Sequence, residues 1–355
     1  MLQQEEELLA SLQWRTIVLD EAQAIKNITS KRSQAAMSLK GEFKIITTGT
    51  PIENHLGELY TLFNFINPGL LGSRKGFNER FAVPISRNDA NVRRTFKKLI
   101  QPFILRRMKS QVLEELPPRT DVILHVDMGP EEAAFYEALR QVSIKKLALT
   151  EMPAGQKHLI ILAEIMRLRR ACCNTRLIMP ESSLPSAKLD LFGEVVTELL
   201  ENRHKALVFS QFVGHLSIIR EFLDIKGIEY RYLDGSTPAV KRSEEVDAFQ
   251  TGQGDFFLIS LKAGGLGLNL TAADYVIHMD PWWNPAVEDQ ASDRAHRIGQ
   301  ERPVTVYRLV TRNTIEEKIV KLHQEKRNLA SSLLEGSDMS GKISAEELLN
   351  MIREQ

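Results

Sequence analysis

Two adjacent acids follow a short apolar run near the start of the chain. Asp20 and Glu21 come directly after Ile17–Leu19, at the head of the tetrapeptide Asp20–Gln23. A carboxylate at such a position can hold a magnesium ion through water, and its neighbour can orient or deprotonate an attacking water. The alternative is an ordinary strand-to-loop boundary with solvated acids. The position directly after an apolar strand favours a functional role for the pair.

A pair of arginines lies near residue 300. Arg294 and Arg297 are three residues apart within residues 290–300, so both can project from one helical face or turn. Two guanidinium groups with five donors each suit the charge that develops on a triphosphate. Two surface arginines are the alternative, and for an isolated pair they are the better interpretation. Here the neighbouring segments favour phosphate chemistry, and we expect the arginines to face the acidic pair across a shared cleft.

Three further loops carry residues suited to phosphate or nucleic acid. Thr48–Pro51 follows a second apolar strand, although such clusters are most often plain turns. Three glycines within residues 264–267 follow another strand, where glycine lets the backbone approach phosphate or ribose closely. Asp280–Pro285 holds paired tryptophans, which are either ordinary packing or a platform at a nucleic-acid groove.

Parallel strands are the elements that bring these loops together. Residues 15–23 and 43–51 each indicate a buried strand with polar residues at its tip, and residues 29–40 can supply the crossover helix. From residue 186 the same rhythm predicts a doubly wound α/β sheet, whose sites lie at the carboxyl ends of the strands. Five strands are expected at residues 205–211, 229–236, 255–261, 275–280 and 304–310, with helices at 190–202, 214–226, 240–250 and 286–295.

The remaining segments are mainly helical. Residues 68–185 show helical periodicity, apart from one strand expected between the prolines of 116–130. We interpret this stretch as a helical insertion followed by a connector. The chain after residue 312 is predicted to be a charged helical tail.

Composition bounds the possible partners. The 355 residues suffice for about two domains. Lys plus Arg number 46 and Asp plus Glu also number 46, which rules out a uniformly basic nucleic-acid coat but not a local basic groove. Residues 87–119 hold nine basic residues against three acids, so they form either a solvated helical face or a phosphate-tracking surface. The nine are Arg87, Arg93, Arg94, Lys97, Lys98, Arg106, Arg107, Lys109 and Arg119.

The cysteines and the apolar runs of the sequence bear on the cellular compartment in which the protein is expected. Cys172 and Cys173 are adjacent, so they rarely bridge, and two cysteines alone cannot build a zinc or iron–sulfur site. A reduced chain is expected. No apolar run approaches the roughly 18 residues that a membrane span needs. The first ten residues are acidic where a secretion signal is basic. We therefore expect a cytoplasmic protein that does not enter a membrane.

Taken in order, these segments resemble the Swi/Snf-type ATPases of helicase superfamily two, from about residue 14 to residue 335. Asp293 and His296 replace glycines of the general superfamily form of the sixth motif, a departure that is typical of this branch. The ordered set is far more specific than any single motif. The motifs correspond to residues 20–23 (magnesium-binding motif), 47–68 (extended third motif), 102–118 (connector), 205–212 and 232–237 (fourth motif region), 263–274 and 280–285 (fifth) and 289–300 (sixth).

The resemblance implies two RecA-like lobes with ATP in the cleft between them. Asp20 would coordinate Mg²⁺, Glu21 would position the water, and Arg294 and Arg297 would act as arginine fingers, which are worth about 10³ to 10⁵ in rate. Gln23 and Thr50 would couple hydrolysis to DNA contacts. The implied ATP contacts are Asp20, Gln23, Gly265, Gly267 and Gln290, and the candidates for gripping DNA are Asn54, Ser236, Ser260, Lys262, Asn269 and Trp282.

The family also implies a division of the chain and an activity. We expect residues 1–67 to be the C-terminal half of an incomplete first lobe and residues 68–185 the insertion and connector. Residues 186–312 are then a complete second lobe and residues 313–355 the tail. The implied activity is DNA-stimulated ATP hydrolysis with translocation along double-stranded DNA, which displaces a bound protein such as a polymerase or a repressor. A monomer is expected.

A motor of this type needs a phosphate-binding loop, G-x-x-x-x-G-K-[ST]. Only 19 residues precede Asp20, too few for a βαβ unit of about 30 residues. Residues 336–342 match the spacing, but Ile343 stands where Ser or Thr is required, and a helix precedes the segment. We therefore expect the C-terminal portion of such an ATPase, which hydrolyses ATP little by itself.

Two alternatives stay open at this point. The chain is otherwise a non-catalytic product of a truncated or split gene that binds DNA or a partner polypeptide. A strand-separating helicase is the other alternative, and the extended third motif and residues 282–285 argue against it. The short insertion between the lobes points to a bacterial or archaeal relative.

Overall fold

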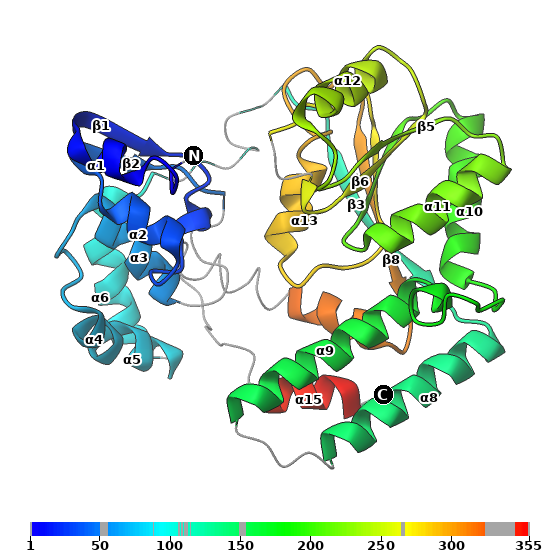
Figure 1. The fold of residues 1–355 in the computed structure, drawn as a ribbon, viewed down its shortest axis with the longest axis horizontal. Coiled ribbons are helices and arrows are strands. Elements are labelled where there is room, and N and C mark those ends of the chain that lie inside the picture. Colours follow the sequence, from blue (N-terminus) through cyan, green and yellow to red (C-terminus); the bar gives the residue numbers. More distant parts are fainter. Residues whose placement is uncertain are drawn as a thin grey trace. The chain divides into compact units, whose positions relative to one another are not determined.

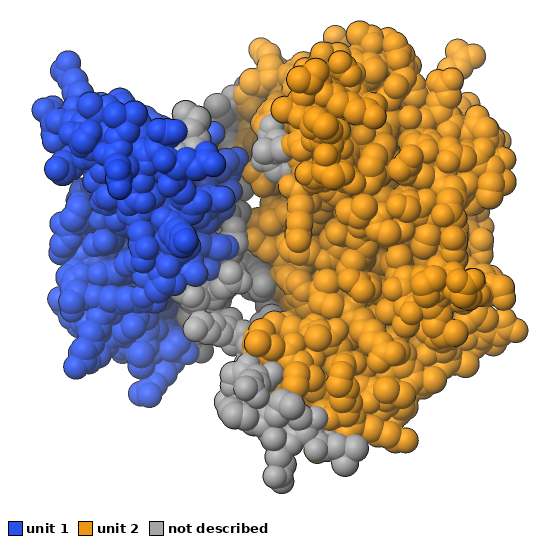
Figure 2. Space-filling model, in the orientation of Figure 1, with its two compact units in different colours: residues 1–106, 324–343 blue, residues 107–323, 344–355 orange. Residues whose placement is uncertain are grey.

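The structure is a computed structural model that describes residues 2–49, 56–87, 89–105, 107, 109, 113, 115–148, 154–263, 267–323 and 345–353. The described residues up to 105 form one compact unit, and those from 107 onward form a second (Figure 2). Several positions singled out above lie outside the described residues, namely Thr50, Asn54, Arg106, Gly264, Gly265 and residues 336–342.

The first unit begins with two parallel strands joined through a helix (Figure 1). Strand β1 (Gln13–Leu19) pairs in parallel with β2 (Lys40–Ile46). Helix α2 (Lys31–Met37) connects them, and the side chain of Ser30 caps it by accepting a hydrogen bond from the main-chain N–H of Ser33. The predicted strands and crossover helix are confirmed. The short helices α1 (Glu6–Ser11) and η1 (Ala22–Ile25) flank β1.

These two strands are far less buried than the sequence predicts. Ile17 is the buried residue of β1, whereas the side chains of Val18 and Phe43 are 56% and 61% exposed. The expectation of buried strands is therefore wrong here. Only two strands form this sheet among the described residues, so side chains on its uncovered parts have few neighbours to pack against.

Helices complete the first unit. Phe77 is central to an aromatic core, with ring centroids 5.0 Å from Tyr60 and 5.8 Å from Phe96. Offset and edge-on contacts of this kind stabilise a small core beyond the area that they bury. The helices are α3 (Leu56–Ile66), α4 (Arg74–Phe77), the π-helical η2 (Asn78–Ala82), α5 (Val83–Ser86), α6 (Ala90–Ile100) and η3 (Gln101–Phe103).

The second unit is built on a six-stranded sheet in which every pair is parallel. The strand order is β3-β8-β7-β4-β6-β5. Successive strands are therefore added first on one side of β4 and then on the other, as in doubly wound folds. All five strands expected after residue 186 are present, and the strand expected between the prolines adds a sixth. They are β3 (Arg119–Val126), β4 (Ala206–Ser210), β5 (Tyr230–Leu233), β6 (Phe256–Ser260), β7 (Tyr275–His278) and β8 (Val304–Thr311).

Helices cover both faces of this sheet, because the central strands are apolar on both sides. Phe192 and Ile219 pack with Val208 on one face, whereas Phe249 and Ala291 pack with Leu207 on the other. Two separate apolar cores result, and they hold the strand tips rigidly. The helices of the two faces are α10 (Ala187–Glu201), α11 (Val213–Ile225), α12 (Ala239–Gln250) and α13 (Pro285–Ser292).

The stretch interpreted as a helical insertion and connector, residues 68–185, is divided between the units. Its described residues up to 105 belong to the first unit and those from 107 onward to the second. The reason is that β3 pairs with β8 along its whole length, which draws the following helices into the second unit. These are α8 (Pro130–Ala148), α9 (Ala154–Cys173) and η4 (Thr175–Leu177), with α15 (Ala345–Arg353) against α8 and α9 (Figure 1).

Helix α15 is joined to α8 by hydrogen bonds from the Arg140 guanidinium to the main-chain oxygens of Ile352 (2.9 Å) and Arg353 (3.0 Å). The last helix of the chain therefore belongs to the second unit. In the described part of the chain, no helix is both long enough and apolar enough to span a bilayer.

Candidate nucleotide and nucleic-acid site

The acidic pair lies at the tip of β1, as predicted. Asp20 Oδ1 accepts hydrogen bonds from the main-chain N–H of Glu21 (2.9 Å) and from the hydroxyl of Thr47 (2.5 Å). Glu21 has φ 50° and ψ 48°, in the left-handed region that few non-glycine residues adopt. Such a conformation costs about 1–3 kcal/mol and concentrates at functional sites. Both carboxylates are exposed to solvent, where they are accessible to a cation.

Gln23 joins the acidic motif to the tip of β2. Its Nε2 donates a 2.6 Å hydrogen bond to Glu21 Oε2, and its Oε1 accepts a 2.8 Å hydrogen bond from the hydroxyl of Thr48. A main-chain hydrogen bond of 2.9 Å from Ala22 N to the oxygen of Thr47 holds the two tips together. The structure therefore brings together the two motifs that the sequence placed at neighbouring strand ends.

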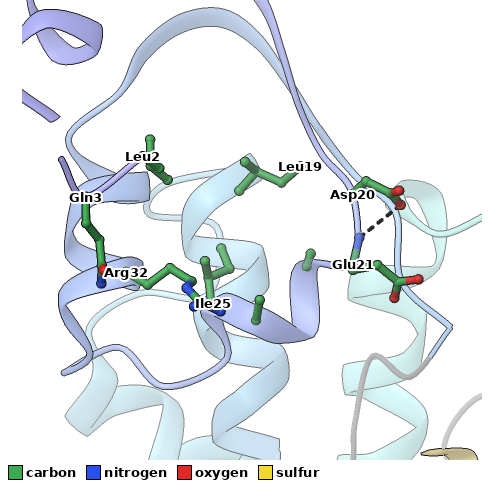
Figure 3. Close-up of a pocket in the computed structure, with 9 residues that line it drawn as sticks. Leu2, Gln3, Leu19, Asp20, Glu21, Ile25 and Arg32 are labelled. Atoms are coloured by element: carbon green, nitrogen blue, oxygen red, sulfur yellow. Dashed lines mark hydrogen bonds between the residues drawn. The ribbon is translucent and has the colours of Figure 1, made fainter. Parts of the chain in front are cut away.

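A hollow of about 240 Å³ adjoins this tip. Its lining is mainly apolar and includes Leu2, Leu19 and Ile25. The carboxylates of Asp20 and Glu21 lie at one end of the lining and point away from the side chains at the other end (Figure 3). The hollow is therefore not centred on the acidic pair, and we assign it no part in the chemistry.

The two arginines have different environments in the second unit. Both follow the end of α13 and lie on turns, and Gln290 lies within α13. Arg294 is only 3% exposed, and its main-chain oxygen accepts a 3.0 Å hydrogen bond from the N–H of Leu270. Arg297 is exposed, and its Nη1 lies 3.5 Å from the main-chain oxygen of Leu268. The acidic pair belongs to the first unit, so a cleft shared with these arginines stays a prediction.

The candidate DNA-gripping residues of the second unit follow the carboxyl ends of its parallel strands. Ser236 follows β5, and its hydroxyl donates a 2.6 Å hydrogen bond to Asp234, which lowers the pKa of that carboxyl. Ser260 ends β6 and is buried, whereas Lys262 and Asn269 are exposed. Gly267, at φ 69°, occupies a conformation that other residues rarely adopt. Carboxyl ends of parallel strands share one edge of a sheet, so these residues lie along one edge.

Trp282 is partly a packing residue. Its ring is half-buried and lies 5.8 Å from the guanidinium carbon of Arg169, which also lies 5.5 Å from the ring of Trp283. Its main-chain N–H donates a 2.7 Å hydrogen bond to Glu288, and its main-chain oxygen accepts one from His323. The packing interpretation of the paired tryptophans is therefore supported, and a role of Trp282 at DNA stays a prediction.

The basic stretch 87–119 is used in two different ways. Arg119 is engaged by Asp121 (2.8 Å) and Asp289 (3.0 Å), and Lys109 lies 2.7 Å from Asp293. These cations are tied to carboxylates inside the second unit. On the first unit, Arg94 and Lys98 of α6 are exposed. Both interpretations of the basic stretch, a solvated helical face and a phosphate-tracking surface, therefore stay predictions for α6.

The positive charge of the connector, residues 102–118, did not indicate which groups hold it in place. The Lys109 ammonium lies 2.9 Å from the main-chain oxygen of His296, and His296 Nε2 lies 2.8 Å from the main-chain oxygen of Pro117. Burial raises the pKa of Asp121, but hydrogen bonds from Arg119 and Arg308 outweigh it, and the net pKa is lowered. The connector is thus bonded to the segment that carries both arginines of the sixth motif.

The two α/β units, with polar residues at their strand tips, define a helicase-type ATPase core with RecA-like folds. Comparison with family models agrees. Residues 1–177 match the SNF2-related domain, and residues 187–299 match the helicase conserved C-terminal domain.

Solved structures and curated relatives narrow the class. The Sulfolobus solfataricus SWI2/SNF2 ATPase core domain is 34% identical with a TM-score of 0.56, over 97% of this chain and 72% of that one. The same organism's core in complex with dsDNA is 32% identical with a TM-score of 0.55, over 100% and 73%. The Bacillus subtilis protein YwqA, named as an ATP-dependent helicase/translocase, is 38% identical over 96% of this chain.

The chain belongs to the SNF2 family of superfamily 2 helicase-like ATPases. It spans 38% of the length of YwqA. The resemblance that rested on ordered motifs is therefore confirmed.

Proposed function

We propose that this chain is part of a DNA-stimulated ATPase that translocates along double-stranded DNA and remodels protein–DNA complexes. The observation that carries the proposal is the hydrogen-bonded cluster of Asp20, Glu21, Gln23 and Thr48, built from two adjacent strand tips in a member of the SNF2 family. The similarity to a SWI2/SNF2 core that was solved with dsDNA supports DNA as the ligand.

The donor set at the β1 tip fits magnesium. Asp20 offers exposed carboxylate oxygens, the hard ligands that Mg²⁺ prefers, and its Oδ1 is oriented by two hydrogen bonds. When bound, the ion supplies neutralisation of phosphate charge. In this proposal Asp20 holds the ion, Glu21 orients and deprotonates the attacking water, and Gln23 holds Glu21 in position through its amide.

The second unit supplies the complementary groups in this proposal. Arg297 is the exposed guanidinium and therefore the better candidate for an arginine finger, whereas the buried Arg294 positions the turn that carries it. Gln290 and Gly267 contact the nucleotide. Ser236, Ser260, Lys262 and Asn269 contact one DNA strand, with Lys262 and Asn269 the more accessible of the four.

We also propose that these 355 residues hydrolyse ATP little by themselves, because their sequence contains no complete phosphate-binding loop. The test compares steady-state hydrolysis, with and without duplex DNA, by this chain and by a longer chain that includes such a loop. We expect DNA-stimulated turnover in the longer chain alone. Robust ATP hydrolysis by the 355 residues would refute the proposal that they are nearly inactive. It would not contradict the roles assigned to the site residues.

The assigned site has its own test in the longer chain. Glu21→Gln removes the base but keeps the hydrogen-bonding shape, and we expect a loss of about 10²–10⁴-fold in turnover. Glu42→Gln, an exposed acid in β2, is the matched control and should keep full activity. Equal activity of the two variants would overturn the role of Glu21.

A second candidate is a non-catalytic module that binds DNA or a partner polypeptide. The exposed apolar side chains of Val18, Phe43 and Ile45 on β1 and β2 favour it, because such groups are usually covered in a stable protein. It predicts salt-dependent DNA binding or partner binding without turnover even when a phosphate-binding loop is present. Cytoplasmic location and a monomeric state stay predictions, and light scattering of the purified chain tests the latter.

A further inference from the structure

Three side chains capable of binding a metal meet inside the second unit. Cys173 ends α9, His215 lies in the first turn of α11, and Asp280 follows β7. Their ligand atoms, namely the Cys sulfur, a ring nitrogen of His and a carboxylate oxygen, all lie within 4.8 Å of one another. Strands β4 and β7 are paired neighbours, so the segments that follow them meet at one edge of the sheet.

His215 is the anomalous member of the cluster. It is 0% exposed, and neither Nδ1 nor Nε2 has a hydrogen-bond partner among the described residues. An unsatisfied buried polar group costs about 1–3 kcal/mol, so native proteins rarely retain one without a partner. The imidazole therefore offers two buried nitrogens, and the ligand atoms of Cys173 and Asp280 lie within 4.8 Å of it.

Cys173 and Asp280 complete a donor set. Both are buried, at 0% and 3% exposure, and Cys173 is a free thiol. Asp280 already accepts a 2.5 Å hydrogen bond from the hydroxyl of Ser210. The main-chain N–H of Gln211 lies 3.4 and 3.3 Å from its two oxygens, and Arg169 Nη2 lies 3.9 Å from Oδ1. Only the Ser210 bond is short, so a metal bond would replace one of the longer contacts.

Sulfur, imidazole nitrogen and carboxylate oxygen together match the ligands of zinc. Tetrahedral zinc with bonds of about 2.0–2.3 Å separates its ligand atoms by about 3.5 Å. The ligand atoms therefore have to approach one another by at most about 1.3 Å to reach that separation. Three protein ligands leave the fourth tetrahedral position to a water molecule.

The surrounding charges do not exclude a cation. Lys188 is paired with Glu316, whose two oxygens both lie 2.7 Å from its ammonium. Arg169 faces Asp280 and donates to the main-chain oxygen of Pro281. Lys188 thus has its own acidic partner, whereas Arg169 would share Asp280 with the metal and keeps hydrogen bonds to Gln211 and to the main-chain oxygen of Pro281. A Cys173 thiolate would offset half of the charge of a zinc ion.

We propose that Cys173, His215 and Asp280 form a zinc site with three protein ligands that ties the end of α9 to the start of α11 and to the tip of β7. The site would hold Asp280 and the following tryptophan segment in place at the edge of the sheet. It includes none of the acidic pair in the first unit, although Asp280 is the first residue of the second part of the fifth motif, and metal binding can be tested without an ATPase assay.

Elemental analysis and cobalt substitution test this proposal on the full chain. We expect about one zinc per chain after purification without chelators from zinc-supplemented medium. Refolding with Co²⁺ should produce a thiolate-to-metal charge-transfer band. Cys173→Ser should weaken metal binding by at least about tenfold and abolish the band. Cys172→Ser, which changes the adjacent buried thiol outside the cluster, is the matched control and should keep both.

His215→Leu separates the zinc site from a simple unsatisfied histidine, even if Cys173→Ser fails to fold. Replacing an unpartnered buried imidazole by an apolar side chain should leave Tm unchanged or raise it, whereas loss of a zinc ligand should lower Tm and remove the metal. A metal-free wild-type chain without a cobalt band overturns the proposal. Metal retained equally in His215→Leu, or a higher Tm of that variant, overturns it too.

Discussion

The hydroxyl of Thr48 donates a 2.8 Å hydrogen bond to Oε1 of Gln23, across 25 positions of the chain. The same amide donates to Glu21, so one side chain links the acidic motif at the β1 tip to the polar motif at the β2 tip. A change at either strand tip can therefore reach the glutamate that we assign to the attacking water. This relationship gives a direct means of testing the coupling between the two motifs.

Thr48→Val removes the hydroxyl but keeps the branched shape of the side chain. In a chain that includes a phosphate-binding loop, we expect the DNA-stimulated rate to fall about two- to tenfold, which corresponds to one ordinary hydrogen bond. Steady-state hydrolysis with and without duplex DNA measures the effect. Thr197→Val is the control, because the Thr197 hydroxyl donates to the main-chain oxygen of Gly193 within α10, away from the proposed contact residues in the sequence. A rate equal to that of the control would show that the Thr48 contact has no catalytic role.

Arg294→Ala and Arg297→Ala should separate stability from rate. Arg294 is 3% exposed, so its truncation leaves a cavity and should lower the free energy of unfolding by about 2 kcal/mol or more. Arg297 is exposed, and its truncation should change stability by about 0.5 kcal/mol or less while lowering turnover by about 10³-fold or more. Urea unfolding and ATPase assays measure the two quantities. Full turnover in Arg297→Ala would remove it as the arginine finger.

Asp121 should contribute stability that depends on pH. Its pKa is lowered from 3.8, so its contribution is present above that value and is lost as pH falls through the lowered pKa. Asp121→Asn should therefore cost about 1 kcal/mol at neutral pH, a modest figure because the carboxyl is partly exposed, and less once the pH falls below the lowered pKa.

Urea unfolding across this pH range measures the difference between wild type and Asp121→Asn. Asp127→Asn is the control, since Asp127 pairs with Arg312 on the exposed surface. A cost of Asp121→Asn that stays constant with pH would contradict the assignment.

The exposed cations of α6 should set part of the salt dependence of DNA binding. Replacing Arg94 and Lys98 by Ala should each reduce the slope of log affinity against log salt by about 1 and weaken binding to all sequences alike. Binding isotherms at several salt concentrations measure the slope. Lys75→Ala, an exposed lysine of α4 outside the basic stretch, should leave the slope unchanged. Slopes that do not differ would assign α6 to the solvated-face alternative.

The sequence predicted the alternation of strands and helices well, because apolar runs of strand length followed by helical periodicity occur in few arrangements. It also placed the polar motifs at strand tips, and β1 with Gln23 and β4 with Ser210 confirm that placement. The prediction that β1 is buried was wrong, because the burial of a strand depends on the elements that pack beside it and on its two faces. The two cysteines gave no reason to expect a metal cluster, since His215 and Asp280 lie far from Cys173 in the chain.

Local sequence by itself determined the strands, the helices, the order of the motifs and the family, because each depends on residues that are close in the chain. Only the tertiary structure decided that Arg294 is buried and Arg297 exposed, and that Lys109 contacts His296. It also brought Cys173, His215 and Asp280 together. Contacts of this kind depend on how parallel strands and their covering helices pack in three dimensions, and packing is a property of the whole unit rather than of any segment.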